Sequence, residues 1–387
     1  MASAPRLVTA ETLGEVAPVA QQVIRIGYLS RAAEDARPAL YGLPPRLSDE
    51  GAQGARLGLD DINSSGRFMG QRFELAETLL AEGEDAGEAL RAFAETGRSL
   101  VVAYLPAADL DPALAAPEAV RTIIFNAGAP DDRFRGADCR AYLMHTIPSR
   151  AMLADALAQY LVRKRWTKWF LVVGSRPGDV LYAEAVRRAA GKFGAEVVSE
   201  KAWVGRFDAR RTAAEEIPLF TQDVRYDVLV VADEGGFFGD LFLYRTWDPR
   251  LVAGTQGLTP AGWHPRLEQW GAAQLQSRFL RKANRSMTSR DYAAWAAVRS
   301  IGEAATRTRS SAPHVIAEYI QSDRFELAAF KGRKLSFRAW DGQLRQPIPV
   351  GWSESVVSVS PQEGFLHRSS ELDTLGFDAP ENACHRG

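Results

Sequence analysis

The sequence predicts an α/β fold of two Rossmann-like lobes, each built on a parallel central sheet. With 387 residues the chain is too long for one ordinary hydrophobic core, since single domains commonly hold about 100 to 150 residues. In the first half, short apolar runs alternate with amphipathic segments, and the same alternation starts again near residue 149. Such alternation is typical of parallel strands joined by crossover helices.

The first half begins with the apolar run VIRIGYL at 23–29, which predicts a buried strand. In the stretch GARLGLDDINSSGRFMGQRFEL at 54–75, apolar residues recur on roughly one face of a short helix, which the Ser-Ser-Gly at 64–66 ends. Residues 72–77 then alternate like a strand. Further along, this half contains predicted helices at 84–96 and 109–119 and predicted strands at 99–105 and 121–126.

The second half starts with an amphipathic helix at 149–165, for which Ser149 is the expected N-cap. The run YDVLVVA at 226–232 is the clearest strand of the chain. Around it the patterns predict a strand at 169–173, an extended segment at 195–203, and helices at 179–193 and 212–222. Later patterns predict helices at 264–284, 291–308 and 313–322, then β structure at 335–340 and 344–350 around an Asp341-Gly342 turn.

The composition excludes several classes of partner. The chain has 47 basic and 48 acidic residues and a formal net charge of -1, so neither nucleic acid nor an anionic membrane surface is expected as its main partner. No apolar run reaches the length of about eighteen residues that a membrane-spanning helix needs. Residues 1–22 lack the apolar centre of a secretion signal. Either a cytoplasmic protein or an exported protein without its leader fits this N-terminus.

The two cysteines, Cys139 and Cys384, allow two interpretations. One is a pair of free, partly buried thiols. The other is a disulfide, because Cys384 lies three residues from the end of a polar tail, where a buried thiol is not expected. In the chain-entropy description, closing so long a loop stabilises the fold by roughly 5 kcal/mol. A disulfide would indicate an oxidising compartment.

No motif has the spacing of a catalytic site, so the chain is not expected to be an enzyme. A phosphate-binding loop and a Gly-x-Gly-x-x-Gly after a strand are both missing. GSRPG at 174–178 differs from a nucleophile elbow, since Arg176 stands in the place of the nucleophile. The five histidines have no metal-ligand spacing. A two-lobed α/β chain of this kind commonly holds a ligand between its lobes, near the C-terminal ends of its strands.

Two segments resemble the type I periplasmic binding proteins of the leucine/isoleucine/valine-binding class. The first is the stretch at 54–75, with Gly-Ala, Asp-Ile-Asn, Gly and Gly-Gln-Arg-Phe-Glu-Leu in the order of that class. The second comprises Phe279–Lys282, Tyr292–Val298 and Gly332–Trp340. The resemblance implies the periplasmic binding protein type I fold, with two lobes joined by three hinge crossings near Thr146-Ile147, Ala253-Gly254 and Lys334.

The same resemblance implies a domain organisation. Lobe 1 would comprise residues 23–146 and 254–333, and lobe 2 would comprise 147–253 and 334–360. Residues 1–22 would form an N-terminal extension. Residues 361–387 would form a tail tied to lobe 1 by the Cys139–Cys384 pair.

Three further segments resemble a narrower branch, the binding proteins associated with pyrroloquinoline quinone-dependent alcohol oxidation systems of methylotrophy. These are 126–139, 145–161 and LDTLGFD at 372–378. The loops at 30–46 and 103–109 depart from the pattern that grips an amino acid. The resemblance implies a periplasmic monomer that binds a small molecule and works with an ABC transporter permease, and with a quinone-dependent alcohol dehydrogenase system as a further partner.

Pyrroloquinoline quinone is planar and carries three carboxylates, so a site for it needs guanidinium forks and aromatic faces. We expect the loops between the lobes to supply them. The candidate ligand-binding residues are Tyr28, Arg31, Arg37, Arg46, Tyr104, Arg133, Arg176, Tyr182, Phe237 and Trp263. The quinone is expected as a bound ligand, and no catalytic cofactor is expected.

Two alternatives stay open. A hard cation such as a lanthanide would need several carboxylate oxygens, and the same loops contain Glu34, Asp35, Asp109, Asp111, Asp131, Asp132, Asp233 and Glu234. No stretch has the alternating ligands of a calcium loop, and arginines lie near the acidic pairs. The other alternative is a ligand sensor or cofactor chaperone that works without a permease.

Overall fold

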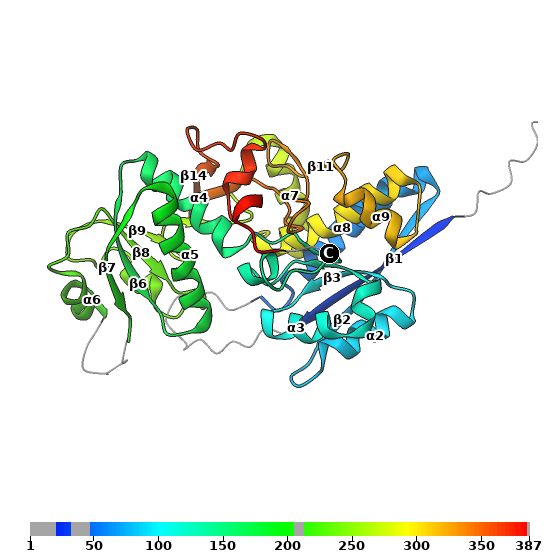
Figure 1. Ribbon diagram of the computed structural model, residues 1–387, viewed down its shortest axis with the longest axis horizontal. Coiled ribbons are helices and arrows are strands. Elements are labelled where there is room, and N and C mark those ends of the chain that lie inside the picture. Colours follow the sequence, from blue (N-terminus) through cyan, green and yellow to red (C-terminus); the bar gives the residue numbers. More distant parts are fainter. Residues whose placement is uncertain (1–20, 32–46, 205–212, 385–387) are drawn as a thin grey trace, which may run out of the picture.

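Two lobes lie side by side, and each is built on its own parallel sheet (Figure 1). The computed structural model describes residues 21–31, 47–204 and 213–384. Strands β1 to β5 belong to lobe 1, and strands β6 to β9 belong to lobe 2. The predicted pair of parallel sheets is therefore confirmed.

The lobe 1 sheet has the strand order β2-β1-β3-β4-β5, and neighbouring strands are parallel throughout. Residues on β3 alternate between two hydrophobic cores: Val102 faces the core beside helices α1, α7 and α8, and Val101 faces the core beside α2 and α3. Both faces of the sheet are thus covered, as parallel sheets require. The strands are β1 (Gln22–Arg31), β2 (Gln71–Leu80), β3 (Leu100–Tyr104), β4 (Ile123–Asn126) and β5 (Leu143–His145). The helices are α1 (Ala52–Gly66), α2 (Ala86–Glu95), α3 (Ala107–Ala115), α7 (Ala272–Ala283), α8 (Ser289–Thr308) and α9 (Pro313–Gln321).

The Asp-Ile-Asn at the end of α1 joins the helix to the strand that follows. Asn63 Nδ2 donates to the Phe73 carbonyl at 3.0 Å, and the Phe73 N–H donates to Asn63 Oδ1 at 2.9 Å. Asp61 accepts from Trp295 Nε1 at 3.0 Å. Gly70 then turns the chain with a left-handed φ of 66°, a conformation that glycine adopts without steric cost. The stretch positions β2 in the sheet, as its pattern suggested.

The lobe 2 sheet has the order β7-β6-β8-β9, again parallel throughout. Helices α4 and α5 cover one face, and α6 with the loop before β9 covers the other. Ser149 caps α4 as predicted, since its side chain accepts from the Met152 N–H at 3.3 Å. The strands are β6 (Lys168–Val173), β7 (Glu196–Ala202), β8 (Val228–Ala232) and β9 (Leu251–Gly254), and the helices are α4 (Arg150–Arg163), α5 (Pro177–Phe193) and α6 (Ala213–Thr221).

The late β structure differs from the predicted hairpin around Asp341-Gly342. That turn exists, but only a single antiparallel bridge, Phe337 to Leu344, spans it. The segment departs from a ladder because its turn pairs with His145 of β5: the His145 N–H donates to the Gly342 carbonyl and the Leu344 N–H donates to the His145 carbonyl, both at 2.8 Å. Arg338 and Arg345, on its two arms, both bind Asp373 of the tail. The regular antiparallel pairs are β10 (Thr259–Pro260) with β13 (Ile348–Trp352), β13 with β14 (Ser355–Ser360), and β11 (Leu327–Ala328) with β12 (Lys334–Leu335).

Side-chain packing places two hinge crossings later in the chain than predicted. Leu258 packs in the lobe 2 core and Trp263 in the lobe 1 core, so the second crossing falls between them rather than at 253–254. Leu344 still packs in the lobe 1 core, whereas Val350 packs in lobe 2. The third crossing therefore falls after residue 344 rather than near 334, because β12 pairs with β11 and stays in lobe 1.

Two buried polar side chains join the three crossings. Lys331 is 1% exposed, and its Nζ donates to the Gly262 carbonyl, to Gln346 Oε1 and to the Pro347 carbonyl. Gln346 Nε2 donates to the Thr146 carbonyl at 2.9 Å. Burial holds the pKa of Lys331 well below its usual value. The hinge is thus a connected hydrogen-bond network rather than three independent segments.

The C-terminal tail contacts both lobes. Gly376 lies against lobe 2, where its N–H donates to Asp155 at 2.8 Å and its carbonyl accepts from Arg188 and Lys192. Further on, Cys384 forms the predicted disulfide with Cys139, so the free-thiol alternative is wrong.

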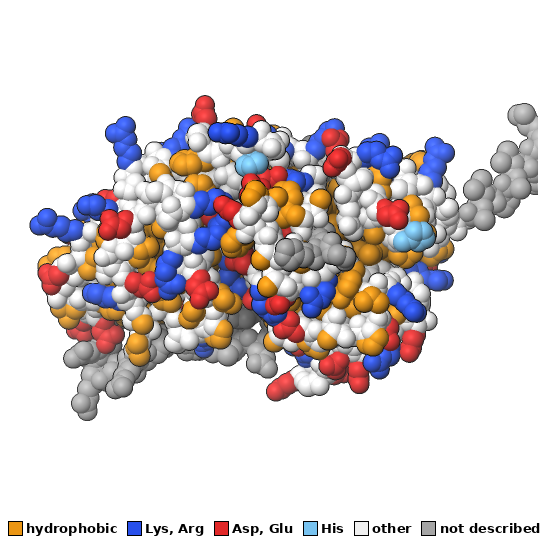
Figure 2. Space-filling model, viewed as in Figure 1, with side chains coloured by type: hydrophobic (Ala, Val, Ile, Leu, Met, Phe, Trp, Pro, Cys, Tyr) orange, Lys and Arg blue, Asp and Glu red, His pale blue; other side chains and the backbone are white. Residues whose placement is uncertain are grey.

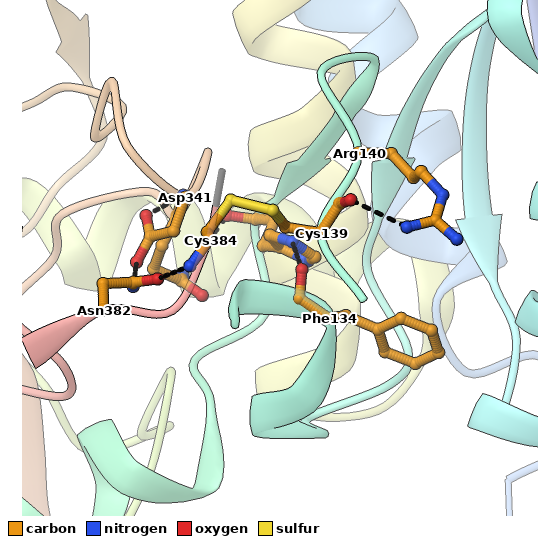
Figure 3. The surroundings of a disulfide bond; sticks show 8 residues. Phe134, Cys139, Arg140, Asp341, Asn382 and Cys384 are labelled. Carbon is orange, nitrogen blue, oxygen red and sulfur yellow. Dashed lines mark hydrogen bonds between the residues drawn. A yellow bond between two sulfur atoms is a disulfide. The ribbon is translucent and has the colours of Figure 1, made fainter. Parts of the chain in front are cut away.

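Figure 3 shows the surroundings of this bond: Asn382 donates to Asp341 at 3.3 Å and accepts the Cys384 N–H at 2.7 Å. Cys139 lies in the loop between β4 and β5 of lobe 1. The tail therefore runs from one lobe to the other and is covalently fixed at its end.

Basic and acidic side chains are interspersed over the visible face of the molecule (Figure 2). This agrees with the nearly balanced composition. Among the described residues, no helix has the length and apolar character needed to cross a bilayer.

Candidate ligand-binding cavity between the lobes

A cavity of about 1020 Å³ lies between the two lobes. The loops that follow parallel strands line it from both sides, which is where open α/β sheets place their ligands. Lobe 1 contributes Glu50 before α1, Pro106 after β3, Pro130 after β4, Pro148 after β5 and Arg290 at the start of α8. Lobe 2 contributes Arg176–Asp179 and Tyr182 after β6, Asp233–Gly236 after β8 and Thr255-Gln256 after β9.

Two carboxylates of the lobe 2 wall bind their own backbone. Asp233 is fully buried and accepts the N–H groups of Phe237, Phe238 and Gly239 at 3.0, 2.7 and 2.7 Å. Asp179 accepts the N–H groups of Arg176 at 3.1 Å and Glu234 at 2.8 Å. Burial raises the pKa of Asp179. Both carboxylates therefore shape the loops, and their oxygens are occupied.

Two donors of the same wall have no such partner. Tyr182 is 2% exposed and lines the cavity, yet its hydroxyl has no hydrogen-bond partner among the described residues. Burial raises its pKa, so the hydroxyl keeps its proton. Arg176 is exposed, its guanidinium lies over the Phe237 ring, and it pairs with no acid in the described part of the chain. A buried hydroxyl without a partner is costly, so a ligand that accepts from Tyr182 would remove that cost.

The lobe 1 wall is organised by side chains. Glu50 accepts from the Tyr104 hydroxyl at 2.8 Å and from Arg290 Nη1 at 3.1 Å. Burial alone would raise the pKa of Glu50, but Arg290 and Tyr104 outweigh it and the pKa is lowered. The side chain of Arg290 is half exposed. A guanidinium carries five donors, and within the described ranges the bond to Glu50 is the one side-chain hydrogen bond that Arg290 makes, so its other N–H groups are available to a ligand.

Arg150, at the start of α4, joins the loops of the two lobes through the cavity residue Glu234. Its Nε and Nη2 donate to the two carboxylate oxygens of Glu234 in lobe 2, both at 2.7 Å. Its Nη1 lies 3.1 Å from Asp131 Oδ1 in lobe 1. The arginine side chain is only 7% exposed. This buried ion-pair chain occupies the carboxylate of Glu234, so the four acidic side chains of the cavity all have protein partners.

Of the ten predicted ligand-binding residues, Arg176 and Tyr182 line the cavity. Arg31 and Arg133 do not, because nearby acids bind their guanidinium groups. Arg31 donates to both carboxylate oxygens of Asp109 at 2.5 and 2.8 Å. Arg133 donates to Asp111 at 2.6 Å and to Asp138 at 2.8 Å.

The aromatic candidates have mixed positions. Tyr28 and Trp263 are buried in the lobe 1 core. The Tyr104 hydroxyl donates to Glu50, and the Phe237 ring packs against the guanidinium of Arg176. The last two candidates, Arg37 and Arg46, lie outside the described residues.

Three residues of the candidate site were not predicted from the sequence: Glu50 and Arg290, which line the cavity, and Arg150, which binds the cavity residue Glu234. Arg290 and Arg150 each follow an N-cap, Thr288 and Ser149, and helix starts of this kind are where a crevice residue should have been sought. Glu234 was weighed only as a metal ligand. Among the described residues no group of three or more His, Cys, Asp or Glu side chains has the geometry to hold a metal ion. Glu34 and Asp35 lie outside them.

Comparison with known proteins agrees with this architecture. A family model described as periplasmic binding protein matches residues 42–210, which is less than half of the chain. No curated protein matches the chain. The match is to a family of binding proteins, which agrees with the prediction that the chain is not an enzyme.

Several solved structures of binding proteins have the same fold as this chain. A branched chain amino acid ABC transporter periplasmic ligand-binding protein from Burkholderia xenovorans has a TM-score of 0.72 and 14% identity over 93% of this chain and 99% of its own. A leucine-, isoleucine-, valine-, threonine- and alanine-binding protein from Brucella ovis, in a closed conformation, has a TM-score of 0.69 and 14% identity over 95% and 99%. A substrate-binding protein from Desulfitobacterium hafniense in complex with Leu has a TM-score of 0.65 and 17% identity over 88% and 100%. The chain therefore has the periplasmic binding protein type I fold, as predicted.

Proposed function

We propose that this protein is a periplasmic solute-binding protein that captures a small organic anion between two closing lobes, with pyrroloquinoline quinone as the ligand. The observation that carries the proposal is the set of donors on opposite walls of the cavity. Arg176 and Tyr182 face it from lobe 2, and Arg290 faces it from lobe 1. A ligand that accepts from both walls stabilises the closed arrangement over the open one.

The sign of the ligand charge follows from which hydrogen-bonding groups of the cavity already have protein partners. Glu50, Asp179, Asp233 and Glu234 all bind protein donors. Within the described residues the Tyr182 hydroxyl has no hydrogen-bond partner, and Arg176 forms no ion pair and lies over the Phe237 ring. A cavity with spare donors and occupied acceptors favours a ligand rich in acceptors, and carboxylates pair with guanidinium groups most strongly.

The quinone meets these requirements because it is planar and carries three carboxylates. Arg176 stacked on Phe237 offers a flat cationic face beside the cavity. The volume of about 1020 Å³ lies at the upper end of the range of small-molecule sites, about 300 to 1000 Å³. Branch-specific segments in the sequence support the same ligand.

An amino acid is the second candidate, because several solved structures of this fold are named for branched-chain amino acids. An amino acid would need an acceptor for its ammonium group, and the described carboxylates of the cavity are occupied. Delivery to an ABC transporter permease is part of our proposal. The alternative is direct delivery to an alcohol dehydrogenase system. Permease and ATPase genes next to the gene for this protein would exclude that alternative.

Titration of the purified protein with pyrroloquinoline quinone tests the proposal. Tryptophan quenching and the absorbance of the quinone report binding, and leucine and lanthanum chloride serve as parallel titrants. We expect saturable binding of one quinone at micromolar concentration, with a decrease in the radius of gyration by X-ray scattering. Saturation by leucine alone would replace the ligand and leave the binding function standing. Saturation by none of the three would remove the ligand proposal.

A further inference from the structure

A second cavity of about 760 Å³ lies within lobe 1, between α1, α7, α8 and the segment around β11. Its lining is rich in charge, with more basic than acidic side chains. The charged residues are Asp61, Arg278, Arg299, Glu303, Arg307 and Arg309. This excess of cations is unlike the molecule as a whole, whose charges nearly balance.

Two of the four arginines have acidic partners. Arg278 binds Asp61, and Arg307 donates to Glu303 one helical turn away at 2.8 Å. The second oxygen of Asp61 accepts from Trp295 Nε1 at 3.0 Å. The two acids of the cavity thus pair directly with Arg278 and Arg307, and they act on Arg299 only at longer range, where the charge of each raises its pKa.

Of the two arginines of this lining without an ion pair among the described residues, Arg309 is exposed, and the more buried one is Arg299. It extends from the middle of α8, is half-buried, and forms no ion pair with an acid of the described residues. Its Nε is buried and has no hydrogen-bond partner there. Burial lowers the pKa of Arg299, yet the guanidinium remains a cation at neutral pH because its ordinary pKa is so high. A half-buried cation without an anion is unfavourable, and the cavity beside it has room to admit one.

We propose that this cavity binds a small organic carboxylate. The carboxylate would pair with Arg299, whose planar fork fits two oxygens. Met69 and Phe330 form an apolar part of the lining, which favours an organic body over a bare inorganic ion. Ser64, Gln274 and Thr306 supply neutral hydrogen-bonding groups at the edge.

The second site is separate from the cavity between the lobes. Arg290 and Arg299 stand nine positions apart on α8, which corresponds to about 13 Å along the helix axis. No residue lines both cavities. The proposal consequently does not depend on the function proposed above.

Sodium benzoate is the probe for the test, with benzamide as its neutral analogue and inorganic phosphate as the inorganic anion. The indole N–H resonance of Trp295, identified with Trp295→Phe, reports the site, because that group lies in the lining. We expect a saturable shift with benzoate and at least about tenfold weaker binding of benzamide. No saturation up to about 20 mM benzoate, where an affinity is too weak to matter, would overturn the proposal.

Two arginine variants locate the binding. Arg299→Gln should weaken benzoate binding by about tenfold or more, while Arg307→Gln, on the same helix but paired with Glu303, should change it by less than about threefold. Circular dichroism and thermal melting confirm that both variants fold. Equal binding by Arg299→Gln and the parent would contradict the proposal. Loss of the shift in Arg290→Gln but not in Arg299→Gln, or tighter binding of phosphate than of benzoate, would also overturn it.

Discussion

The two walls of the cavity between the lobes hold their polar groups in different ways. In lobe 2, Asp233 binds backbone N–H groups of its own loop, and Asp179 binds one N–H group of its own loop and one of the loop after β8. In lobe 1, Glu50 is held by the side chains of Tyr104 and Arg290 from other elements. Backbone anchoring fixes the lobe 2 loops before any ligand arrives. Side-chain anchoring leaves the lobe 1 wall able to exchange partners when a ligand competes for Arg290. The acids of lobe 2 are thus structural, and its donors are the groups left for a ligand.

The largest expected effect comes from Asp233→Ala, which removes the carboxylate that binds the backbone of the loop after β8. Three N–H groups, two of them buried, would lose a charged acceptor, so we expect the free energy of unfolding to fall by about 3 kcal/mol. Ligand binding should be lost with it. Asp240→Ala, an exposed acid in the same loop, should change stability by less than about 0.5 kcal/mol. Equal stability of the two variants in urea unfolding would show that the loop does not depend on Asp233.

Replacing one arginine in each wall tests how much each lobe contributes to the affinity for the ligand. Arg176→Gln should weaken quinone binding by about 2 kcal/mol, or about thirtyfold, because a charge-assisted bond is lost. Its thermal stability should not change, since the side chain has no ion-pair partner in the described residues. Arg290→Gln should reduce both affinity and stability, because Glu50 would lose its cation. Unchanged affinity for the quinone in Arg176→Gln would mean that the ligand does not contact the lobe 2 wall.

Tyr182→Phe is expected to have opposite effects on stability and binding. Removing a buried hydroxyl without a partner should stabilise the unliganded protein by up to about 1 kcal/mol. Loss of the same donor should weaken ligand binding by about fivefold. Tyr226→Phe removes another buried hydroxyl, in the lobe 2 core away from the cavity, and should leave affinity unchanged. Destabilisation by Tyr182→Phe would show that the hydroxyl has a structural partner.

The smallest expected effect is on the pH dependence of stability, and it concerns His264, next to the second crossing between the lobes. His264 Nδ1 accepts the Arg266 N–H at 3.1 Å, so its Nε2 donates to the Trp352 carbonyl at 3.1 Å across the second crossing. Burial lowers the pKa of His264 below its usual 6.5. The unfolded chain then binds the proton first, so stability falls as pH falls below about 6.5. Melting of His264→Gln should depend less on pH between about 7.5 and 5.5. An identical pH profile in this variant would exclude His264 as the source.

The sequence predicted the elements well because their signals are local. The strand predicted at 226–232 forms as β8 (Val228–Ala232), and the helix predicted at 313–322 forms as α9 (Pro313–Gln321). Alternation and apolar periodicity specify such elements without knowledge of their neighbours. The crossings were placed less well, since Leu335 and Leu344 could be assigned to a lobe only from their packing.

The site was predicted only in part, because pairing between distant residues decides which charges are available. Arg31 and Arg133 lie on loops of the expected kind, yet Asp109 and Asp138 bind them. Tyr182 was found since it follows a clear strand and a helix start. Arg290 was missed because it lies on α8, more than 100 residues after Arg176 in the sequence, and only the folded chain brings both residues to the same cavity.

The tail sets a geometric limit on the opening of the protein. Gly376 is held by α4 and α5 of lobe 2, and Cys384 is bonded to Cys139 of lobe 1. The eight residues from one anchor to the other reach at most about 28 Å when fully extended. The lobes cannot part further than this along that edge while both anchors hold. Reduction of the bond would remove this covalent limit and leave the tail held to lobe 1 by the hydrogen bonds that Arg338 donates to Asp373 and to the Leu375 carbonyl.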